Sequence, residues 1–338
     1  MSGDLHIFEL VQWFESGVLV EGNNPCVLAF GKNFQRCIDL LLVACGPIPI
    51  AAEGAILHFW ATQNVLKRET VSEADIAKHD EAIAEEHKKL SREGKYKINF
   101  GPGVSTPMQF GAKQLEHFAK SVEDCDRGLR GILSSQLIAT WTAFETLATD
   151  LWIFALNCKP ALASYASLAR VKTDKHDDEP AVRDDLGKSI PISVIEENRF
   201  DLTNCMGSLM KATRKFNFNR LDGIIAAYSA AFGHKCIAIF DKPEYCRLTV
   251  LEGIRNVLVH SAGKIDPEFK KRAKNNQSEY GQLGGIPEGG DLPVDGKMVK
   301  EFMVLCLGIC RDLIAFVDKR VTDNGSGKTQ ETEGAGPA

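Results

Sequence analysis

The sequence predicts an all-α fold, and three observations carry this prediction. Apolar residues between Leu137 and Ala155 recur every three or four positions, as they do on a helix that buries one face. The stretch from Lys297 to Val321 has the same spacing and forms a clean amphipathic stripe. Helix stop signals such as Gly46-Pro47 follow other apolar segments. We therefore expect a helical bundle at the C-terminal side, with an additional helical region before it.

The composition is that of a soluble globular protein. The 338 residues are 44% hydrophobic and 25% charged, and the formal net charge is −5 at pH 7. A chain of this length can hold one large domain or two ordinary ones. Because the net charge is negative, any contact with a nucleic acid has to be local.

The ten cysteines and the first residues of the chain indicate a cytoplasmic protein. No CxxC pair occurs, so we expect reduced thiols, with no metal site and no cofactor. The N-terminus lacks the basic start and apolar segment of a signal peptide. The most apolar run, Ile38 to Trp60, is broken by Gly46, Pro47 and Pro49, so it predicts two buried helices and no membrane span.

Residues 1–100 form an N-terminal helical region whose role the sequence does not indicate. It contains three apolar segments, His6–Val20, Phe34–Ala44 and Ala55–Lys67. In the third segment, His58 lies beside Phe59 and Trp60, and we expect it to be a packed core histidine.

A charge-rich helix is expected within residues 69–95. Its apolar stripe consists of Ile76, Ile83 and Leu90, which are seven positions apart. Such a narrow seam predicts an exposed helix that contacts a neighbour along one line. Residues 101–111 are rich in glycine and proline and are the best candidate for a linker.

We place a helical domain at residues 112–321 and a disordered tail at residues 322–338. The domain opens with a long helical region from Ala112 to Asn157, which we expect to be interrupted near Arg127–Gly131. Residues 171–190 are polar and predict an exposed loop. The tail has no apolar content, which is typical of disorder.

Two locally basic segments could hold phosphate groups. Lys211 to Arg220 interleaves basic residues with Phe216 and Phe218, a combination that can bind phosphates and stack bases. Two core aromatics with a solvated basic rim are the favoured alternative. A second basic segment follows Asp266-Pro267, which starts another helix. The candidates for RNA contacts in these segments are Lys211, Arg214, Lys215, Lys270, Lys271 and Arg272.

The most informative stretch is Leu248–His260, which predicts a helix that ends on a histidine. At about 100° per residue, its apolar residues share a core face. Asn256 and His260 are four positions apart and share the opposite face, with Arg255 at its edge. Val259 lies inside this polar arc, and nothing in the sequence indicates what covers it.

Arg255, four intervening residues and His260 give the pattern R-x4-H, with Asn256 directly after the arginine. This pattern resembles the signature of the HEPN superfamily, helical domains many of which are metal-independent ribonucleases. The chain is similar to the stand-alone bacterial RiboL-PSP-HEPN type. The helix over Leu137–Asn157, with Glu145 near the edge of its apolar face, is similar to the first long helix of such domains. The resemblance covers the helical domain and leaves the first hundred residues unmatched.

The resemblance implies a metal-independent endoribonuclease that uses the ribose 2′-OH as nucleophile and leaves a 2′,3′-cyclic phosphate. It assigns proton transfer to His260, since an unperturbed histidine titrates near pH ~6.5. It assigns phosphate binding and charge stabilisation to Arg255. Asn256 would orient His260 or the phosphate, and Glu145 and Ser261 are accessory candidates. The resemblance also implies a homodimer with a composite site, a role in bacterial stress or phage defence, and a protein antitoxin as partner.

Two other interpretations stay open. The chain could be a HEPN-type module that binds RNA or another protein without cleaving RNA. It could also be a purely structural helical protein, because a histidine in the last turn of a helix is favoured by the helix dipole. Arg255 could then pair with Glu252 or Glu145. Burial of His260 against its own helix end would favour this structural interpretation.

Overall fold

The computed structural model describes the chain in seven stretches, namely residues 4–17, 24–69, 80–93, 103–163, 192–197, 204–212 and 216–322. The fold is all-α, as predicted: the described residues form helices and one isolated bridge between Lys264 and Asp291, and they contain no strand. No helix in these stretches combines the length and the apolar character that crossing a membrane requires.

The chain divides into two compact units. Unit 1 comprises Met1–Leu19, Gln35–Gln136 and Pro293–Glu301. Unit 2 comprises Val20–Phe34, Leu137–Leu292 and Phe302–Ala338.

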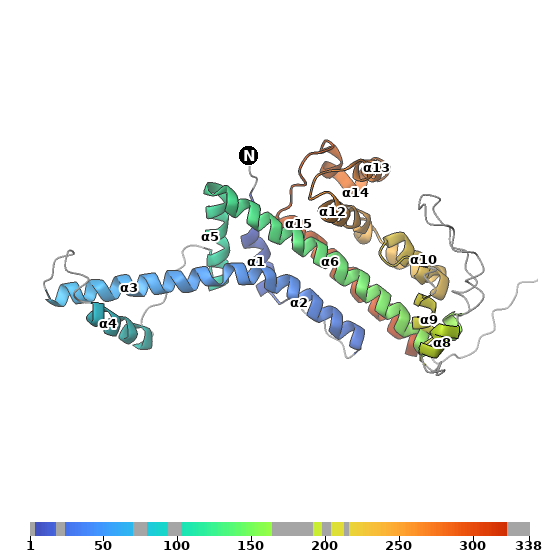
Figure 1. Cartoon of the computed structure of the whole chain (residues 1–338), viewed down its shortest axis with the longest axis horizontal. Helices are drawn as coiled ribbons and strands as arrows, with labels where there is room; N and C mark the ends of the chain where they lie inside the picture. The colour runs from blue at the N-terminus through green and yellow to red at the C-terminus, as the bar shows by residue number, and fades with distance from the viewer. Residues whose placement is uncertain are drawn as a thin grey trace, which may run out of the picture. The chain divides into compact units, whose positions relative to one another are not determined.

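Figure 1 labels most of the helices of both units. Unit 1 holds α1 (Ile7–Glu15), α3 (Pro47–Glu69), α4 (Asp80–Glu93) and α5 (Pro107–Ser121). Unit 2 holds α8 (Ile192–Glu197), α9 (Met206–Ala212), α10 (Leu221–Phe232), α11 (His234–Phe240), η3 (Pro243–Tyr245), α12 (Leu248–His260), α13 (Pro267–Asn275), α14 (Gln277–Tyr280) and η4 (Gly281–Gly285). Three long helices contribute residues to both units: α2 (Pro25–Cys45), α6 (Glu123–Cys158) and α15 (Gly296–Thr322).

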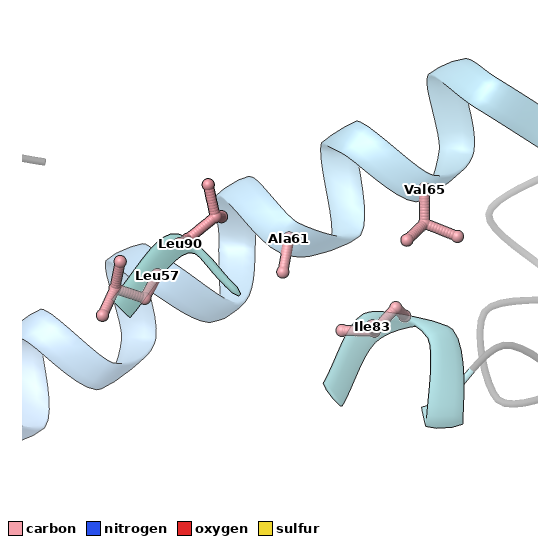
Figure 2. Packing of buried hydrophobic residues seen from close by; sticks show 5 residues of the cluster. All are labelled: Leu57, Ala61, Val65, Ile83 and Leu90. Atoms are coloured by element: carbon pink, nitrogen blue, oxygen red, sulfur yellow. The ribbon is translucent and has the colours of Figure 1, made fainter. Parts of the chain in front are cut away.

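In unit 1, α4 packs on α3 along a single apolar seam (Figure 2). Ile83 and Leu90 of α4 are buried against Leu57, Ala61 and Val65 of α3. The side chains on α3 are four residues apart, so they form one stripe on that helix. This arrangement confirms the predicted contact line at Ile83 and Leu90, whereas Ile76, the third residue of the predicted stripe, lies outside the described residues.

The prediction that His58 is a core histidine is wrong. His58 is exposed, and so are its neighbours Phe59 and Trp60. Because α4 contacts the stripe that contains Leu57 and Ala61, the side chains between these two residues point elsewhere.

Helix α5 begins inside the segment that we predicted as a linker. Thr106 caps it by accepting a hydrogen bond from the Gln109 amide at 3.2 Å, and Pro107 occupies its first turn. A Cβ on Gly111 would lie 2.2 Å from the carbonyl oxygen of Cys45 at the end of α2. This glycine therefore allows two helices to approach closely, and residues 107–111 are helical.

Helix α6 begins at Glu123, after the one extended residue Val122. It runs unbroken through Arg127–Gly131, where we predicted an interruption. An ion pair of 2.9 Å joins Arg130 to Asp126, one turn apart, and supports the helix across this segment.

In unit 2, two buried hydrogen bonds join α6 to α10. The indole N–H of Trp152 donates to the carbonyl oxygen of Ala227 at 2.9 Å. The hydroxyl of Tyr228 donates in the opposite direction, to the carbonyl oxygen of Ala148 at 2.7 Å. These bonds satisfy the polar atoms of two large buried side chains and fix the register of the two helices.

Helices α13 and α14 dock on α12 through two buried rings. Phe269 and Tyr280 pack edge to face with their ring centroids 5.0 Å apart. The Tyr280 hydroxyl donates to the carbonyl oxygen of Thr249 at 3.3 Å. A Cβ on Gly253 would lie 2.5 Å from that hydroxyl oxygen, so this position of α12 has to be glycine for the ring to approach.

Helix α15 extends over Gly296–Thr322, close to the predicted Lys297–Val321. Its predicted apolar stripe is buried throughout: Val299, Phe302, Met303, Cys306, Ile309, Cys310, Leu313 and Val317.

The domain boundaries at residues 100 and 112 were predicted from the part of the sequence that resembles HEPN domains. They stay predictions. The compact units are defined by contacts, and they place α5 and the first part of α6 in unit 1. The predicted loop at residues 171–190 and the tail beyond Thr322 lie outside the described residues.

Candidate functional site

Helix α12 presents the two faces that the sequence predicts. Its apolar residues are buried at Val250, Leu251, Ile254 and Val257 and half-buried at Leu258. Arg255 and Asn256 are half-buried, whereas His260 is exposed and Val259 is 45% exposed. The arc with these four side chains is therefore accessible within unit 2.

Arg255 is held by its neighbour in the chain. One terminal nitrogen of its guanidinium, Nη1, donates to Oδ1 of Asn256 at 3.1 Å. The Nε atom of Arg255 is buried and has no hydrogen-bond partner among the described residues. An unsatisfied buried donor costs about 1–3 kcal/mol. The guanidinium is thus oriented by Asn256, and its buried Nε has an unsatisfied donor.

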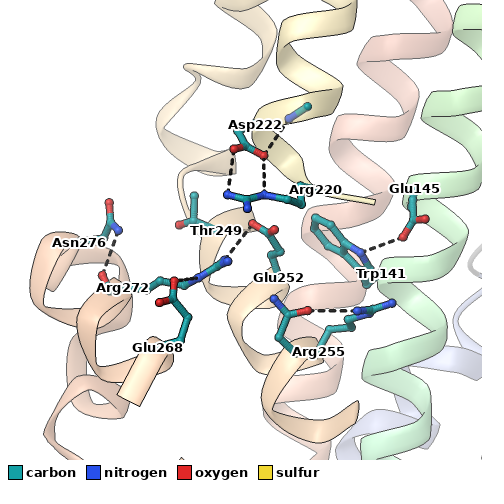
Figure 3. Close-up of polar contacts among 12 residues, drawn as sticks. Trp141, Glu145, Arg220, Asp222, Thr249, Glu252, Arg255, Glu268, Arg272 and Asn276 are labelled. Carbon is teal, nitrogen blue, oxygen red and sulfur yellow. Dashed lines mark hydrogen bonds and ion pairs between the residues drawn. The ribbon is translucent and has the colours of Figure 1, made fainter. Parts of the chain in front are cut away.

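Glu145 of α6 belongs to the same group of side chains. The indole N–H of Trp141 donates to Oε2 of Glu145 at 3.1 Å. Burial raises the pKa of Glu145, and the charges of Arg255 and Lys211 oppose this rise, as does the hydrogen bond from Trp141. Figure 3 shows the guanidinium of Arg255 pointing toward α6, where Trp141 and Glu145 lie. The structure thus brings the accessory candidate Glu145 to Arg255.

The alternative pairing of Arg255 with Glu252 is not formed. Buried Glu252 pairs with Arg272 of α13 at 3.2 Å, and Arg272 also pairs with Glu268 at 3.3 Å (Figure 3). Burial raises the pKa of Glu252, and the charge of Arg272 opposes this effect. Arg272, a predicted RNA contact, is therefore engaged with two carboxylates and ties α13 to α12.

His260 is the last residue of α12, and the turn after it is well bonded. The Ser261 hydroxyl donates to Oδ2 of Asp266 at 3.0 Å. The other carboxylate oxygen of Asp266 accepts the amide N–H of Phe269 at 2.7 Å and so caps α13. Ser261, the second accessory candidate, therefore has a structural role in this turn.

No hydrogen bond or ion pair joins His260 to Arg255, Asn256 or Glu145 in the part of the chain that the structure describes. The imidazole is exposed, so the burial that would favour a structural histidine is not found. Arg255, Asn256 and Glu145 form one group, and His260 stands one turn further along the same arc.

The first basic segment matches the interpretation as core aromatics with a basic rim. Phe216 and Phe218 are buried against Trp152, with ring centroids 5.8 and 5.3 Å from that of the indole. Lys211 is exposed on α9. The two other candidates in this segment, Arg214 and Lys215, lie outside the described residues.

In the second basic segment, the side chain of Lys270 is hydrogen-bonded within the described part of the protein and that of Lys271 is not. The ammonium of Lys270 donates to the carbonyl oxygens of Gly284 and Ile286 at 2.7 and 2.9 Å, so it stabilises η4. Lys271 is exposed on the same helix.

Sequence reasoning missed Trp141 as the partner of Glu145, because it assigned this residue to the apolar stripe alone. The signal was present, since the two residues are four apart on one helix and an indole N–H can reach a carboxylate at that spacing. The buried Nε of Arg255 has no signal in the sequence.

Within the described stretches, no three His, Cys, Asp or Glu side chains are grouped so that they could hold a metal ion. Comparison of the chain with known protein families, with curated proteins and with solved structures found no match. The HEPN resemblance therefore rests on the R-x4-H stretch and its surrounding helices.

Proposed function

We propose that unit 2 is a metal-independent endoribonuclease in which Arg255 binds the scissile phosphate of RNA. The proposal rests on the burial and the hydrogen bonding of Arg255. It is half-buried, one nitrogen is fixed by Asn256, and its buried Nε has no partner among the described residues. A guanidinium that is oriented in advance stabilises the charge that develops on a phosphate during cleavage.

The proposed reaction is a transesterification at phosphorus. The ribose 2′-oxygen loses its proton and bonds to phosphorus, and the bond from phosphorus to the 5′-oxygen breaks. That oxygen takes up a proton, and the products are a 2′,3′-cyclic phosphate and a 5′-hydroxyl. His260 is exposed on the same arc as Arg255 and carries out proton transfer, which histidine supports near neutral pH. Glu145 of α6, which accepts a hydrogen bond from Trp141, interacts with Arg255 through its charge.

The test is cleavage of a labelled single-stranded RNA in the presence of EDTA. The wild type should cut the RNA and leave 2′,3′-cyclic phosphate ends. Replacement of His260 by alanine should lower the rate at least roughly 10²-fold, the lower end of what general acid–base catalysis contributes. His58→Ala is the matched control, because His58 is also an exposed histidine on a helix.

Failure of the wild type to cleave any RNA would remove the proposal. Undiminished cleavage by His260→Ala would remove the assignment of the site. Binding of RNA without cleavage would favour the alternative function, a HEPN-type module that binds RNA or another protein.

The resemblance extends the proposal to the assembly and its setting. It supports a homodimer with a composite site, a cytoplasmic location, a role in bacterial stress or phage defence, and a protein antitoxin as partner. The exposed Val259, one residue before His260, is the feature of the chain that fits a second copy at the site.

A further inference from the structure

A hollow of about 750 Å³ lies where α13, α14 and η4 meet. The side chains around it are mainly basic, and one wall is formed by glycines. Its lining consists of Lys270, Lys271, Ala273, Lys274, Gln277, Gly281 and Gly284. We propose that this hollow is a subsite for the phosphate backbone of single-stranded RNA, with Lys271 and Lys274 as its cationic groups. The identity of the ligand rests on the proposed function.

The three lysines of the hollow are not equivalent. Lys270 is hydrogen-bonded within the protein, since its ammonium donates to two backbone carbonyl oxygens of the η4 region. Lys271 and Lys274 are exposed, and no hydrogen bond or ion pair joins either of them to another described residue. Their two ammonium groups, one helical turn apart, are therefore available to an anion.

Neither Glu268 nor Glu252 neutralises these two lysines. Glu268 and the buried Glu252 both pair with Arg272, at 3.3 and 3.2 Å. Both carboxylates are thus paired with Arg272, and no ion pair joins Lys271 or Lys274 to another described residue. The net charge of the chain is −5. A local basic hollow on an acidic protein directs an anionic ligand to that place.

The hollow is open at Gly281, where one of its walls is backbone alone. A Cβ on Gly281 would have no heavy atom within 4 Å, so the wall at this point has space beside the backbone. Lysine ammonium groups are point charges on flexible stems, and they bind phosphates without requiring one fixed geometry. Such contacts position a strand and do not read its sequence.

The hollow has a fixed relation to the candidate site in unit 2. The ion pair between Arg272 and Glu252 joins α13 to α12 three residues before Arg255. The ring contact between Phe269 and Tyr280 joins α13 to α14, and the hydroxyl of Tyr280 donates to the carbonyl oxygen of Thr249 on α12. A strand held at Lys271 and Lys274 would therefore be held at a constant position relative to Arg255.

The experiment measures binding of a fluorescent single-stranded 2′-O-methyl RNA of about 12 nucleotides, within the usual range of single-strand sites. This RNA has no free 2′-OH, so the wild-type protein can be used whether or not it cleaves RNA. The variant Lys271→Gln/Lys274→Gln is compared with Lys235→Gln/Lys319→Gln, which removes the same charge from two exposed lysines elsewhere in unit 2. Fluorescence anisotropy is recorded at several salt concentrations.

Loss of two phosphate contacts should lower the slope of log affinity against log salt by about 1.4, which corresponds to roughly 25-fold weaker binding at ~0.1 M salt. The control pair should bind like the wild type. Equal affinity and slope for the Lys271/Lys274 variant would overturn the proposal.

A second variant adds charge without removing a lysine. Gln277→Glu replaces an amide in the hollow by a carboxylate of the same shape. Gln282→Glu makes the same replacement at an exposed position that does not line the hollow. Gln277→Glu should weaken binding of RNA, and Gln282→Glu should have a smaller effect. The same result for both variants would overturn the placement of the strand in the hollow.

Inorganic phosphate is the second probe, and it tests a free anion as the ligand. Binding of phosphate that depends on both lysines, together with RNA binding that does not, would overturn the assignment to a polynucleotide. The outcome also separates the two proposals. If RNA binds through Lys271 and Lys274 but is never cleaved, the proposed nuclease activity is wrong and the subsite stands. If RNA is cleaved but binds independently of the two lysines, the subsite is wrong and the nuclease activity stands.

Discussion

Asp312 of α15 accepts two hydrogen bonds on one oxygen. The ammonium of Lys242 and the hydroxyl of Tyr245 both lie 2.6 Å from its Oδ2 atom. Burial acts to raise the pKa of Asp312, but these two bonds outweigh it and hold the pKa below the ordinary value of 3.8. A carboxyl group whose pKa is lowered by folding stabilises the protein above its unfolded pKa. That stability is lost as the pH falls through the folded pKa.

Replacement of Asp312 by asparagine should therefore lower the free energy of unfolding at neutral pH. The expected loss is about 1 kcal/mol, because the side chain is only partly buried and solvent screens the ion pair. Below the folded pKa the difference from the wild type should disappear. Urea unfolding followed by circular dichroism at neutral and acidic pH measures both values. Asp318→Asn, an exposed carboxylate on the same helix, is the control, and an equal loss at both pH values would contradict the assignment.

At the scale of residues, the sequence predicts which side chains share a face but not which partner each takes. The common arc of Arg255, Asn256 and His260 follows from helical spacing alone. The partner of Glu252 does not, because Arg272 comes from α13 and its approach depends on how that helix docks. For the same reason the sequence left the pairing of Arg255 open.

At the scale of elements, α4 depends on its seam with α3. It has 14 residues, and an isolated helix of this length is marginal in water. Ile83 and Leu90 are the buried apolar side chains through which it contacts α3. Loss of either contact should free the helix without unfolding unit 2.

Replacement of Ile83 by alanine should cost about 2–4 kcal/mol of local stability, as expected for removal of a large buried aliphatic side chain. Hydrogen exchange of the α4 amides should accelerate, while exchange in α12 and α15 should stay unchanged. Glu81→Ala, an exposed position on the same helix, should exchange like the wild type. Unchanged exchange of α4 in the Ile83 variant would show that the seam does not hold this helix.

Elements with one clear apolar stripe are the ones that the sequence predicts well. The bounds of α15 differ from the prediction by one residue at each end. The burial of His58 in α3 was wrongly predicted, because apolar residues lie on several sides of this helix and its contacts with other helices decide which stripe is buried. Gly111 and Gly131 show a related difficulty. Gly111 allows a close contact between two helices, and Gly131 lies inside α6. The local sequence around each glycine is also compatible with a hinge, so the sequence alone did not predict these roles.

At the scale of the whole molecule, the proposed reaction raises the question of how many histidines it uses. One proton leaves the 2′-oxygen and another reaches the 5′-oxygen, on opposite sides of the phosphorus atom. In the proposed reaction, the exposed His260 of one chain would serve one of these positions, and the His260 of a second copy would serve the other. Val259, which is 45% exposed beside His260, gives such a copy an apolar contact.

A homodimer formed through this arc should be sensitive to a charge at Val259. Val259→Asp should convert the dimer to monomers and reduce cleavage in EDTA together with it, because desolvating an unpaired carboxylate at an interface is costly. Val304→Asp is the matched control, since Val304 is an apolar side chain on α15 that is 49% exposed. Size-exclusion chromatography with light scattering measures the assembly. A monomeric wild type that cleaves RNA would contradict the composite site, and a dimer that persists in Val259→Asp would place its interface elsewhere on the chain.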